Sequence, residues 1–279
     1  MKIDLYTWSW NDQDRLGFLF THYDQLVRRY VVYDDGSDDQ TLDILRANPK
    51  VEIRQTRFIG TGDSFILSIM PTIQSAWKES RGVADWVIVT EIDEHLHHSD
   101  LPGYLASCKD AGITFIPALG YQMVDEAFPE PAERLCETRG MGAPWHRMSK
   151  VNIFAPDAVE EINYTLGRHV AHPTGRIVAP DRDELLLLHY KYLGFERTFE
   201  RHQACLARLQ PTDIANNFAL RWAYGREALR ADWDSFARRT VDIRRPDLQP
   251  WRTHLEPRWW DRYRRRHVAG DSGPAPVFA

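Results

Sequence analysis

The stretch "RYVVYDDGSDDQTLDILRAN", residues 29–48, contains a strand, a turn and a helix in direct succession. "RYVVYDD" is a short run of β-branched and aromatic residues, which is typical of a buried strand. The polar segment at 34–39 then predicts a tight turn. Ser37 or Asp38 can cap the following helix, which we expect to end before Pro49. The stretch therefore predicts one β-α unit of an α/β fold.

The same alternation continues on both sides of this unit. It predicts a mostly parallel central sheet flanked by helices. Ligands bind such sheets at the C-terminal ends of the strands, where polar clusters follow at 11–14, 34–39 and 91–98. The further expected strands cover residues 3–10, 50–58, 84–93 and 112–119, and the helices cover residues 15–27 and 64–80, the second kinked or interrupted at Pro71.

The rest of the chain predicts a looser second half and a helical end. Residues 125–150 are rich in Pro, Gly, Glu and Trp and are expected to form a long loop. Residues 184–195 are an apolar run with a polar end, and two amphipathic helices are expected at 196–209 and 226–241. We therefore divide the chain into a domain at 1–195, with halves 1–100 and 101–195, and a C-terminal helical extension at 196–279.

The charge, the apolar runs and the cysteine spacing limit the classes of protein to which this chain can belong. The formal net charge is −5 and the pI is about 6.1, which does not indicate a nucleic-acid partner. No apolar run reaches the roughly 18 residues that a membrane span needs, and we expect no leader segment. Cys108, Cys136 and Cys205 are far apart in the sequence, which favours free thiols in a reducing cytoplasm.

The segment "YDDGSDDQTLDIL" resembles the nucleotide-binding segment of family 2 glycosyltransferases and their GT-A-fold relatives. The motif "EID" at 91–93 resembles the Asp-x-Asp-type motif of the same enzymes, with Glu in the first position. The resemblance covers residues 1–195 and implies a GT-A fold. It implies that Asp35 contacts the base or ribose of a sugar nucleotide and that Asp34 supports it. Thr7, Trp8 and Asn11 are expected to complete the nucleotide contacts.

Glu91 and Asp93 are candidate metal ligands. Alternation along a strand would place both carboxylates on one side and Ile92 on the other. Two hard oxygen ligands suit Mn²⁺ or Mg²⁺, which would bridge the diphosphate of the sugar nucleotide. The motif leaves open whether Glu91 contacts the metal or the ribose. The resemblance implies that His189 completes the metal site and that Lys191 neutralises the diphosphate.

The histidines of "HLHH" at 95–98 could instead form a zinc site. The sequence contains no HExxH motif and no spaced ligand pair that would complete one, so we expect these histidines to orient a loop or to contact phosphate and sugar. Trp8, Trp10 and Trp145 are either core residues or stacking platforms for a sugar ring or a base.

An inverting sugar transfer needs a carboxylate that takes the proton of the acceptor hydroxyl. The resemblance places this base after the strand that follows the "EID" motif. Asp125 and Glu126 are the preferred candidates, and Glu130 is a third. Several nearby residues are either contacts to the acceptor or phosphate, or ordinary loop residues: Arg139, Trp145, His146, Lys150 and His169.

The predicted function is transfer of a sugar from a nucleoside-diphosphate sugar to an acceptor hydroxyl of a small molecule or glycan, in solution or at a membrane surface. The extension at 196–279 would shape the acceptor side or form a homo-oligomer contact. The arginine-rich segment 250–267 either grips an anionic partner or, as we favour, packs as a helix on the protein. A nucleotidyltransferase and a non-catalytic sugar-nucleotide-binding protein are the alternatives. The absence of a Gly-rich, basic loop at 8–15 disfavours the former.

Overall fold

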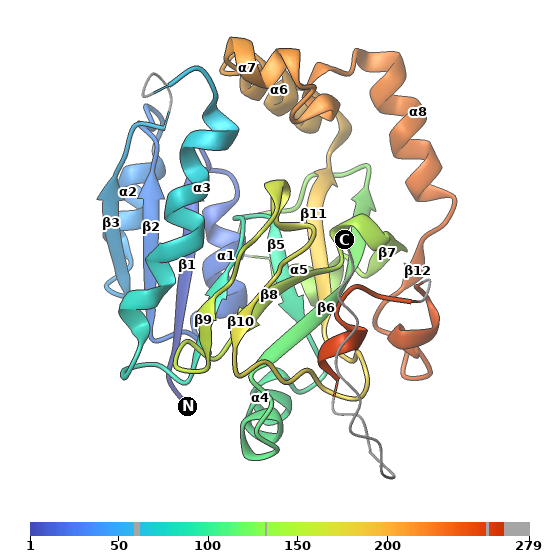
Figure 1. Cartoon of the computed structure of the whole chain (residues 1–279). Coiled ribbons are helices and arrows are strands. Elements are labelled where there is room, and N and C mark those ends of the chain that lie inside the picture. Colours follow the sequence, from blue (N-terminus) through green and yellow to red (C-terminus); the bar gives the residue numbers. More distant parts are fainter. Residues whose placement is uncertain (59–61, 132, 255–256, 265–279) are drawn as a thin grey trace.

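The computed structural model describes residues 1–58, 62–131, 133–254 and 257–264. A central sheet with helices against both faces confirms the predicted α/β class (Figure 1). None of the helices in these ranges is both long and apolar enough to cross a membrane. The strands are β1 (Ile3–Ser9), β2 (Arg29–Asp34), β3 (Val51–Gln55), β4 (Trp86–Val89), β5 (Glu94–His97), β6 (Phe115–Asp125), β7 (Met141–Pro144), β8 (Lys150–Phe154), β9 (Val159–Glu161), β10 (Thr174–Gly175), β11 (Leu186–Leu193) and β12 (Val241–Asp242).

The α-helices and short 3₁₀ turns (η) connect these strands and cover the sheet. The α-helices are α1 (Leu16–Tyr23), α2 (Thr41–Ala47), α3 (Phe65–Ser75), α4 (Leu101–Asp110), α5 (Leu135–Thr138), α6 (Phe195–Leu206), α7 (Pro211–Ala215) and α8 (Arg226–Ala237). The 3₁₀ turns are η1 (Ala76–Ser80), η2 (His146–Met148), η3 (Leu166–Arg168), η4 (Leu220–Ala223), η5 (Pro250–Arg252) and η6 (Asp261–Tyr263).

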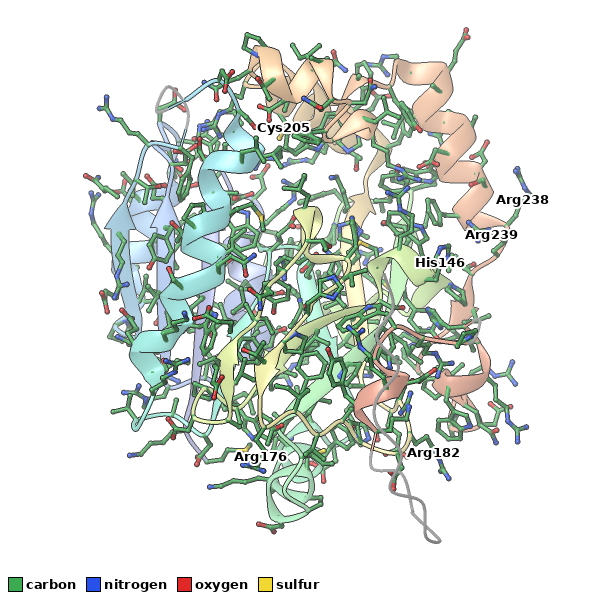
Figure 2. The ribbon with its side chains drawn as sticks, in the orientation of Figure 1. His146, Arg176, Arg182, Cys205, Arg238 and Arg239 are labelled. Atoms are coloured by element: carbon green, nitrogen blue, oxygen red, sulfur yellow. The ribbon has the colours of Figure 1, made fainter. Side chains whose placement is uncertain are left out.

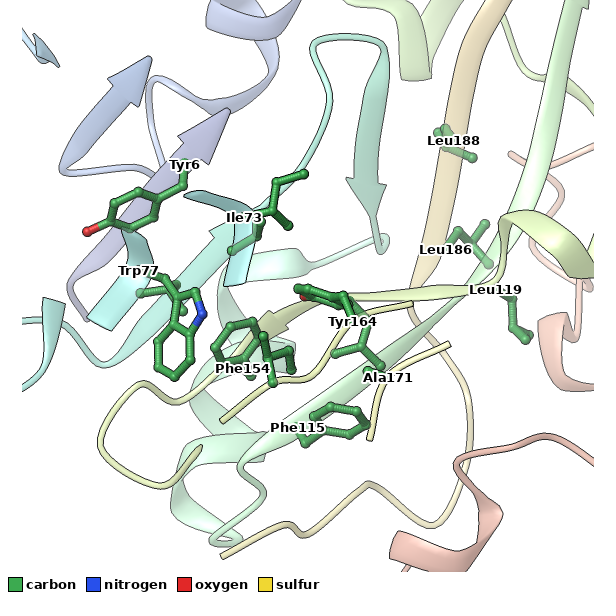
Figure 3. Close-up of a cluster of buried hydrophobic side chains, with 14 of the residues drawn as sticks. Tyr6, Ile73, Trp77, Phe115, Leu119, Phe154, Tyr164, Ala171, Leu186 and Leu188 are labelled. Carbon is green, nitrogen blue, oxygen red and sulfur yellow. The ribbon is translucent and has the colours of Figure 1, made fainter. Parts of the chain in front are cut away.

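The N-terminal half of the sheet is parallel throughout, in the order β4-β1-β2-β3. Alternate side chains of these strands pack on opposite faces, as the period of a strand requires. Ile3 and Leu5 of β1 join the core under α1 and α2, whereas Tyr6 joins the core under α3 with Ile73 and Trp77 (Figure 3). The four expected strands and three helices of this half are present. The last of these helices, α3, runs through Pro71 and ends at Ser75.

The second half of the sheet is mixed. β8 lies between β4 and β6 and runs antiparallel to both, while β11 is parallel to β6 and pairs on its other side with β5. The expectation of a long loop at 125–150 is wrong, because this stretch contains α5, β7 and η2. β7 is held as a strand by its antiparallel pairing with β6, a contact that local composition does not encode.

Two expectations around the "EID" motif are also wrong. β4 ends at Val89, so Glu91 and Asp93 lie in a turn and not on a strand. The backbone N–H of Glu94 closes this turn on the carbonyl of Glu91 (3.2 Å). His95 and His97 then lie in β5 and not in a loop, because the backbone of β5 pairs with β11 from Leu186 to His189.

The C-terminal part confirms helices close to the expected positions, in α6 and α8. The arginine-rich segment forms short 3₁₀ turns and not the expected helix, although it does pack on the protein. Arg258 and Arg264 both bind the buried carboxylate of Asp183 (2.6 Å each), which also accepts a hydrogen bond from the indole N–H of Trp260 (3.0 Å). Residues 255–256 and 265–267 of that segment lie outside the described residues.

Three largely buried histidines should make the fold sensitive to acid. Burial lowers the pKa of His22, His97 and His254 from 6.5 to about 4. The unfolded chain therefore takes up these protons below about pH 6.5, while the folded chain does so only near pH 4, so falling pH favours unfolding across this window. We expect the free energy of unfolding to fall by about 1 kcal/mol per histidine between about pH 7 and about pH 5.5.

Urea denaturation across this pH range measures the effect. The His254→Gln variant, whose amide can still donate to the Gly120 carbonyl that His254 Nε2 now contacts (2.8 Å), should show a smaller dependence on pH. A free energy of unfolding that stays constant from about pH 7 to about pH 5.5 would contradict the prediction.

Candidate functional site

A cavity of about 120 Å³ lies at the C-terminal ends of β1, β2 and β4, beneath α6 and η4. Figure 1 shows α6 and α7 across these strand ends, and Figure 2 shows Cys205, one of the lining residues, on α6. Acidic, basic and aromatic side chains line the cavity together, so it suits a ligand that combines charge with flat rings. Its acids are Asp12, Asp35, Glu91 and Asp93; its cations are Arg15, Lys191, Arg201 and Arg208; its aromatic residues include Trp8, Trp10, Phe65 and Trp222.

Asp35 is held rigidly at the end of β2. Its Oδ1 accepts a hydrogen bond from the backbone N–H of Phe58 (2.6 Å), and its Oδ2 accepts one from Nη2 of Arg208 (2.5 Å). Its own backbone N–H donates to the carbonyl of Ser9 at the end of β1 (2.9 Å). The carboxylate therefore has a fixed position at the cavity wall.

Asp34 and Asn11 lie outside the cavity and shape the turn that carries Asp35. Asp34 Oδ2 accepts hydrogen bonds from the backbone N–H groups of Gly36 (3.1 Å) and Ser37 (3.2 Å). Gly36 has a positive φ of 76°, which glycine adopts without strain. Asn11 donates to the Asp38 carboxylate (2.6 Å) and accepts from its backbone N–H (2.9 Å). Thr7 is fully buried in β1 and also lies outside this cavity.

Asp93 lines the same cavity, and His189 of β11 lies next to it, with 3.9 Å between Asp93 Oδ2 and His189 Nε2. His189 Nδ1 donates to the Gln122 side-chain oxygen (2.6 Å), which leaves a lone pair on Nε2. Burial, followed by the charge of Lys191, lowers the pKa of His189 to about 3, so the ring is neutral. Burial raises the pKa of Asp93, although Lys191 and Arg15 oppose this.

The pair has the chemistry of a partial metal site. A neutral imidazole nitrogen beside a carboxylate oxygen suits a divalent cation, and Gln122 orients the ring as an outer hydrogen-bond partner does in metal sites. Glu91 does not join this pair; its half-exposed carboxylate faces Arg168 (3.5 Å). Within the described residues, no three His, Cys, Asp or Glu side chains are arranged to hold a metal ion.

Beneath the turn, Glu94 is the centre of a fully buried charge network. It pairs with Lys150 and Arg168 (2.5 Å each) and accepts a hydrogen bond from Asn152 (3.0 Å). Burial alone would raise the pKa of Glu94, but Arg168 and Lys150 hold it well below its usual range. Glu94 is therefore a carboxylate that fixes the turn carrying Glu91 and Asp93.

The sequence interpretation missed the cavity cations Arg15, Arg201 and Arg208, and it also missed Arg168, which supports the turn from below. Besides Glu94, Arg168 binds the carbonyl of Val89 at the end of β4 (2.7 Å), and its guanidinium lies over the Trp8 ring, 5.1 Å from the centroid. The interpretation named His169 next to it, but that ring faces the carbonyl of Arg147 (2.5 Å), away from the cavity. A buried acid such as Glu94 implies a cationic partner, but only the fold reveals which one.

Asp125 and Glu126 do not line the cavity. Asp125 pairs with Arg139 (3.0 Å), and the exposed Glu126 pairs with Arg230 of α8 (2.6 Å). Lys191, in contrast, lines the cavity with its ammonium 5.6 Å from the centroid of the Trp222 ring.

The histidines after the turn also lie outside the cavity and make ring contacts. His95 stacks on His22 with 4.6 Å between the ring centroids, and His98 stacks on Tyr104 at 4.5 Å. The first contact packs β5 against α1, and the second packs the residue after β5 against α4.

The chain matches no protein-family model and no curated protein. Crystal structures of S. aureus TarS are similar to it. The 1–349 segment is 14% identical over 56% of this chain and 47% of that chain, with a TM-score of 0.34. The same segment in complex with UDP-GlcNAc is 12% identical over 75% of this chain and 66% of that chain, with a TM-score of 0.35. The chain thus spans about half of the first structure and no more than about two thirds of the second. A likeness at this level assigns neither activity nor ligand to the chain.

Proposed function

We propose that this protein is a glycosyltransferase of the GT-A, family 2-like type, which transfers a sugar from a nucleoside-diphosphate sugar to an acceptor hydroxyl with inversion. One observation carries the proposal. Asp35 and Asp93, which follow β2 and β4, and Lys191 of β11 line one cavity, and His189 lies next to Asp93. A sugar nucleotide needs a partner for its base, compensation for its diphosphate charge and a surface for its sugar, and this cavity offers all three.

In this proposal Asp35 receives the N–H or hydroxyl groups of the base or ribose. Its rigid hydrogen bonds to the protein favour the role, because a fixed acceptor need not be ordered when the ligand binds. Glu91, which is half-exposed at the same cavity and lies 3.5 Å from Arg168, would contact the ribose or the metal. Asp34 and Asn11 act indirectly, by holding the turn.

Asp93 and His189 would hold Mn²⁺ or Mg²⁺. The metal would supply positive charge to the diphosphate, the leaving group of the transfer. Lys191 adds a fixed positive charge on the same wall, and this electrostatic stabilisation is the protein's main contribution to departure of the nucleoside diphosphate.

The acceptor hydroxyl must lose a proton to a nearby carboxylate. Asp125 and Glu126, the candidates for this base, are bound to Arg139 and Arg230 outside the cavity. Either carboxylate could act as the base only after its ion pair with the arginine breaks, for example when an acceptor binds.

A thermal-shift panel with UDP, GDP, dTDP and CDP, each with and without Mn²⁺, tests the proposal. A ligand at 100 times its Kd stabilises the native state by about 2.7 kcal/mol, so we expect one nucleotide to raise the melting temperature by several degrees, and more so with Mn²⁺. Release of that nucleoside diphosphate from its sugar nucleotide should follow. Release of pyrophosphate from a nucleoside triphosphate and a sugar phosphate, or no binding of any nucleotide, would refute the proposal.

A further inference from the structure

Arg208, just beyond the end of α6, places its guanidinium over the Trp10 ring inside the cavity. Its guanidinium carbon is 3.7 Å from the centroid of the Trp10 ring. The same group donates from Nη2 to the side-chain oxygen Oδ2 of Asp35 (2.5 Å) and to the Asp35 carbonyl (3.3 Å). A planar, nitrogen-containing group is thus stacked on an indole while its N–H groups point at a carboxylate.

These are the contacts that a nucleobase makes in a protein. Bases stack on aromatic side chains and are recognised at their edges by hydrogen bonds, and an N–H on a base edge would donate to a carboxylate as Arg208 does. A guanidinium matches such a base in flatness and in donor chemistry, whereas an ammonium group does not. Arg208 therefore makes, from within the chain, both contacts that the Trp10 face and Asp35 would offer to a base.

The cavity is small for a nucleotide, which indicates that the side chains now inside it, Arg208 among them, move before a nucleotide binds. Its volume of about 120 Å³ is well below the roughly 300–1,000 Å³ of small-molecule sites. Arg201 connects α6 to the segment after β1, because it pairs with Asp12 (3.0 Å) and donates to the Trp10 carbonyl (2.7 Å). Both ring nitrogens of His202, also on α6, are buried without a hydrogen-bond partner among the described residues, which costs free energy in this arrangement.

We propose that Trp10 and Asp35 form a nucleobase slot and that Arg208 occupies this slot in the free protein. When a base enters the slot it displaces Arg208, stacks on Trp10 and donates a hydrogen bond to the Asp35 carboxylate. The displaced guanidinium remains charged and pairs with the diphosphate of the same ligand. The inference rests on the proposed function for the identity of the ligand.

The test compares binding of a nucleoside, which offers only the base and ribose, with binding of its diphosphate. The probes are the nucleoside diphosphate that stabilises the wild-type protein and the matching nucleoside, with Kd values from isothermal titration. For Arg208→Ala we expect nucleoside affinity to rise on the order of tenfold, because the competitor is gone, and diphosphate affinity to rise less or to fall.

The Arg208→Lys variant separates the two roles. Lysine keeps the charge but cannot stack as a flat donor, so nucleoside affinity should rise while diphosphate affinity is at least retained. Arg197→Ala, which removes an exposed arginine of α6 outside the cavity, is the matched control and should change neither affinity. Melting curves for each variant establish that it is folded; Asp35 retains its hydrogen bond from Phe58 in both Arg208 variants.

Nucleoside affinity that is unchanged or lower in both Arg208 variants would overturn the inference. In that case Arg208 either leaves the base site unaffected or supports the base directly. If no nucleotide binds the wild-type protein or either variant, the proposed function itself has failed. If nucleotides bind the wild-type protein and the variants show no nucleoside gain, only the inference has failed.

Discussion

Replacing Glu94 by alanine is expected to lower the free energy of unfolding by about 3–5 kcal/mol. Glu94 is fully buried, and its cationic partners Lys150 and Arg168 are 2% and 1% exposed. Removal of this carboxylate would take away the acidic partner of Lys150 and would leave Arg168 with only the half-exposed Glu91 at 3.5 Å. The cost is large because a buried charge without a partner retains its desolvation penalty and loses the attraction that offset it.

Urea denaturation monitored by circular dichroism measures this loss. The Glu126→Gln variant is the matched control, because it breaks an exposed pair with Arg230 and should cost less than about 1 kcal/mol. The Glu94→Gln variant keeps the shape of the side chain and should fall between the two. A Glu94→Ala variant as stable as the wild-type protein would show that the network contributes little to the fold.

Replacing Asp93 by asparagine is expected to reduce sugar-nucleotide turnover by about 100-fold or more, given the proposed function. The substitution preserves the shape of the side chain but removes the negative charge that faces His189 Nε2. Without this charge the pair would hold a divalent cation far more weakly, and the diphosphate would lose its compensation. The stability of the nucleotide-free protein should change little or rise, because burial raises the pKa of Asp93 and so disfavours its charged form.

Two measurements check this prediction. The first is the rate of nucleoside diphosphate release, and the second is the extra thermal stabilisation that Mn²⁺ adds to nucleotide binding. Asp110→Asn, at the exposed end of α4, is the control and should behave like the wild-type protein. If Asp93→Asn retained the Mn²⁺-dependent stabilisation, the assignment of Asp93 to the metal would be wrong.

The N-terminal half of the fold could be predicted because its signals are local. β2 and β4 are short, largely apolar runs, β3 alternates apolar with polar residues, and each helix between the strands has an apolar face. Residues 29–48 alone contain a strand, a turn and a helix, and the structure places β2 and α2 there. The strand ends then bring Asp35, Glu91 and Asp93 to one cavity, as the topology of a parallel sheet requires.

The remaining parts depend on partners that are distant in the sequence. β5 is a strand because it pairs with β11, and the first residue of that register is Glu94, opposite His189. Arg168 reaches the site from a 3₁₀ turn that has no motif of its own. α6 was predicted as a helix, but its amphipathic pattern does not indicate that its next turn places Arg208 on Trp10. In each case the deciding interaction is tertiary, and local residue patterns do not determine it.

The network around Glu94 has a consequence for biosynthesis. Its partners follow 56 and 74 residues later in the chain, at Lys150 and Arg168. While the ribosome is still synthesising those residues, the segment of β4 and its turn has already been synthesised. At that stage the Glu94 carboxylate has no cationic partner. A bare carboxylate stays in water rather than in a protein interior, so we expect the turn to remain open during this interval. We therefore expect Glu91 and Asp93 to reach their final places only after the middle of the chain has emerged.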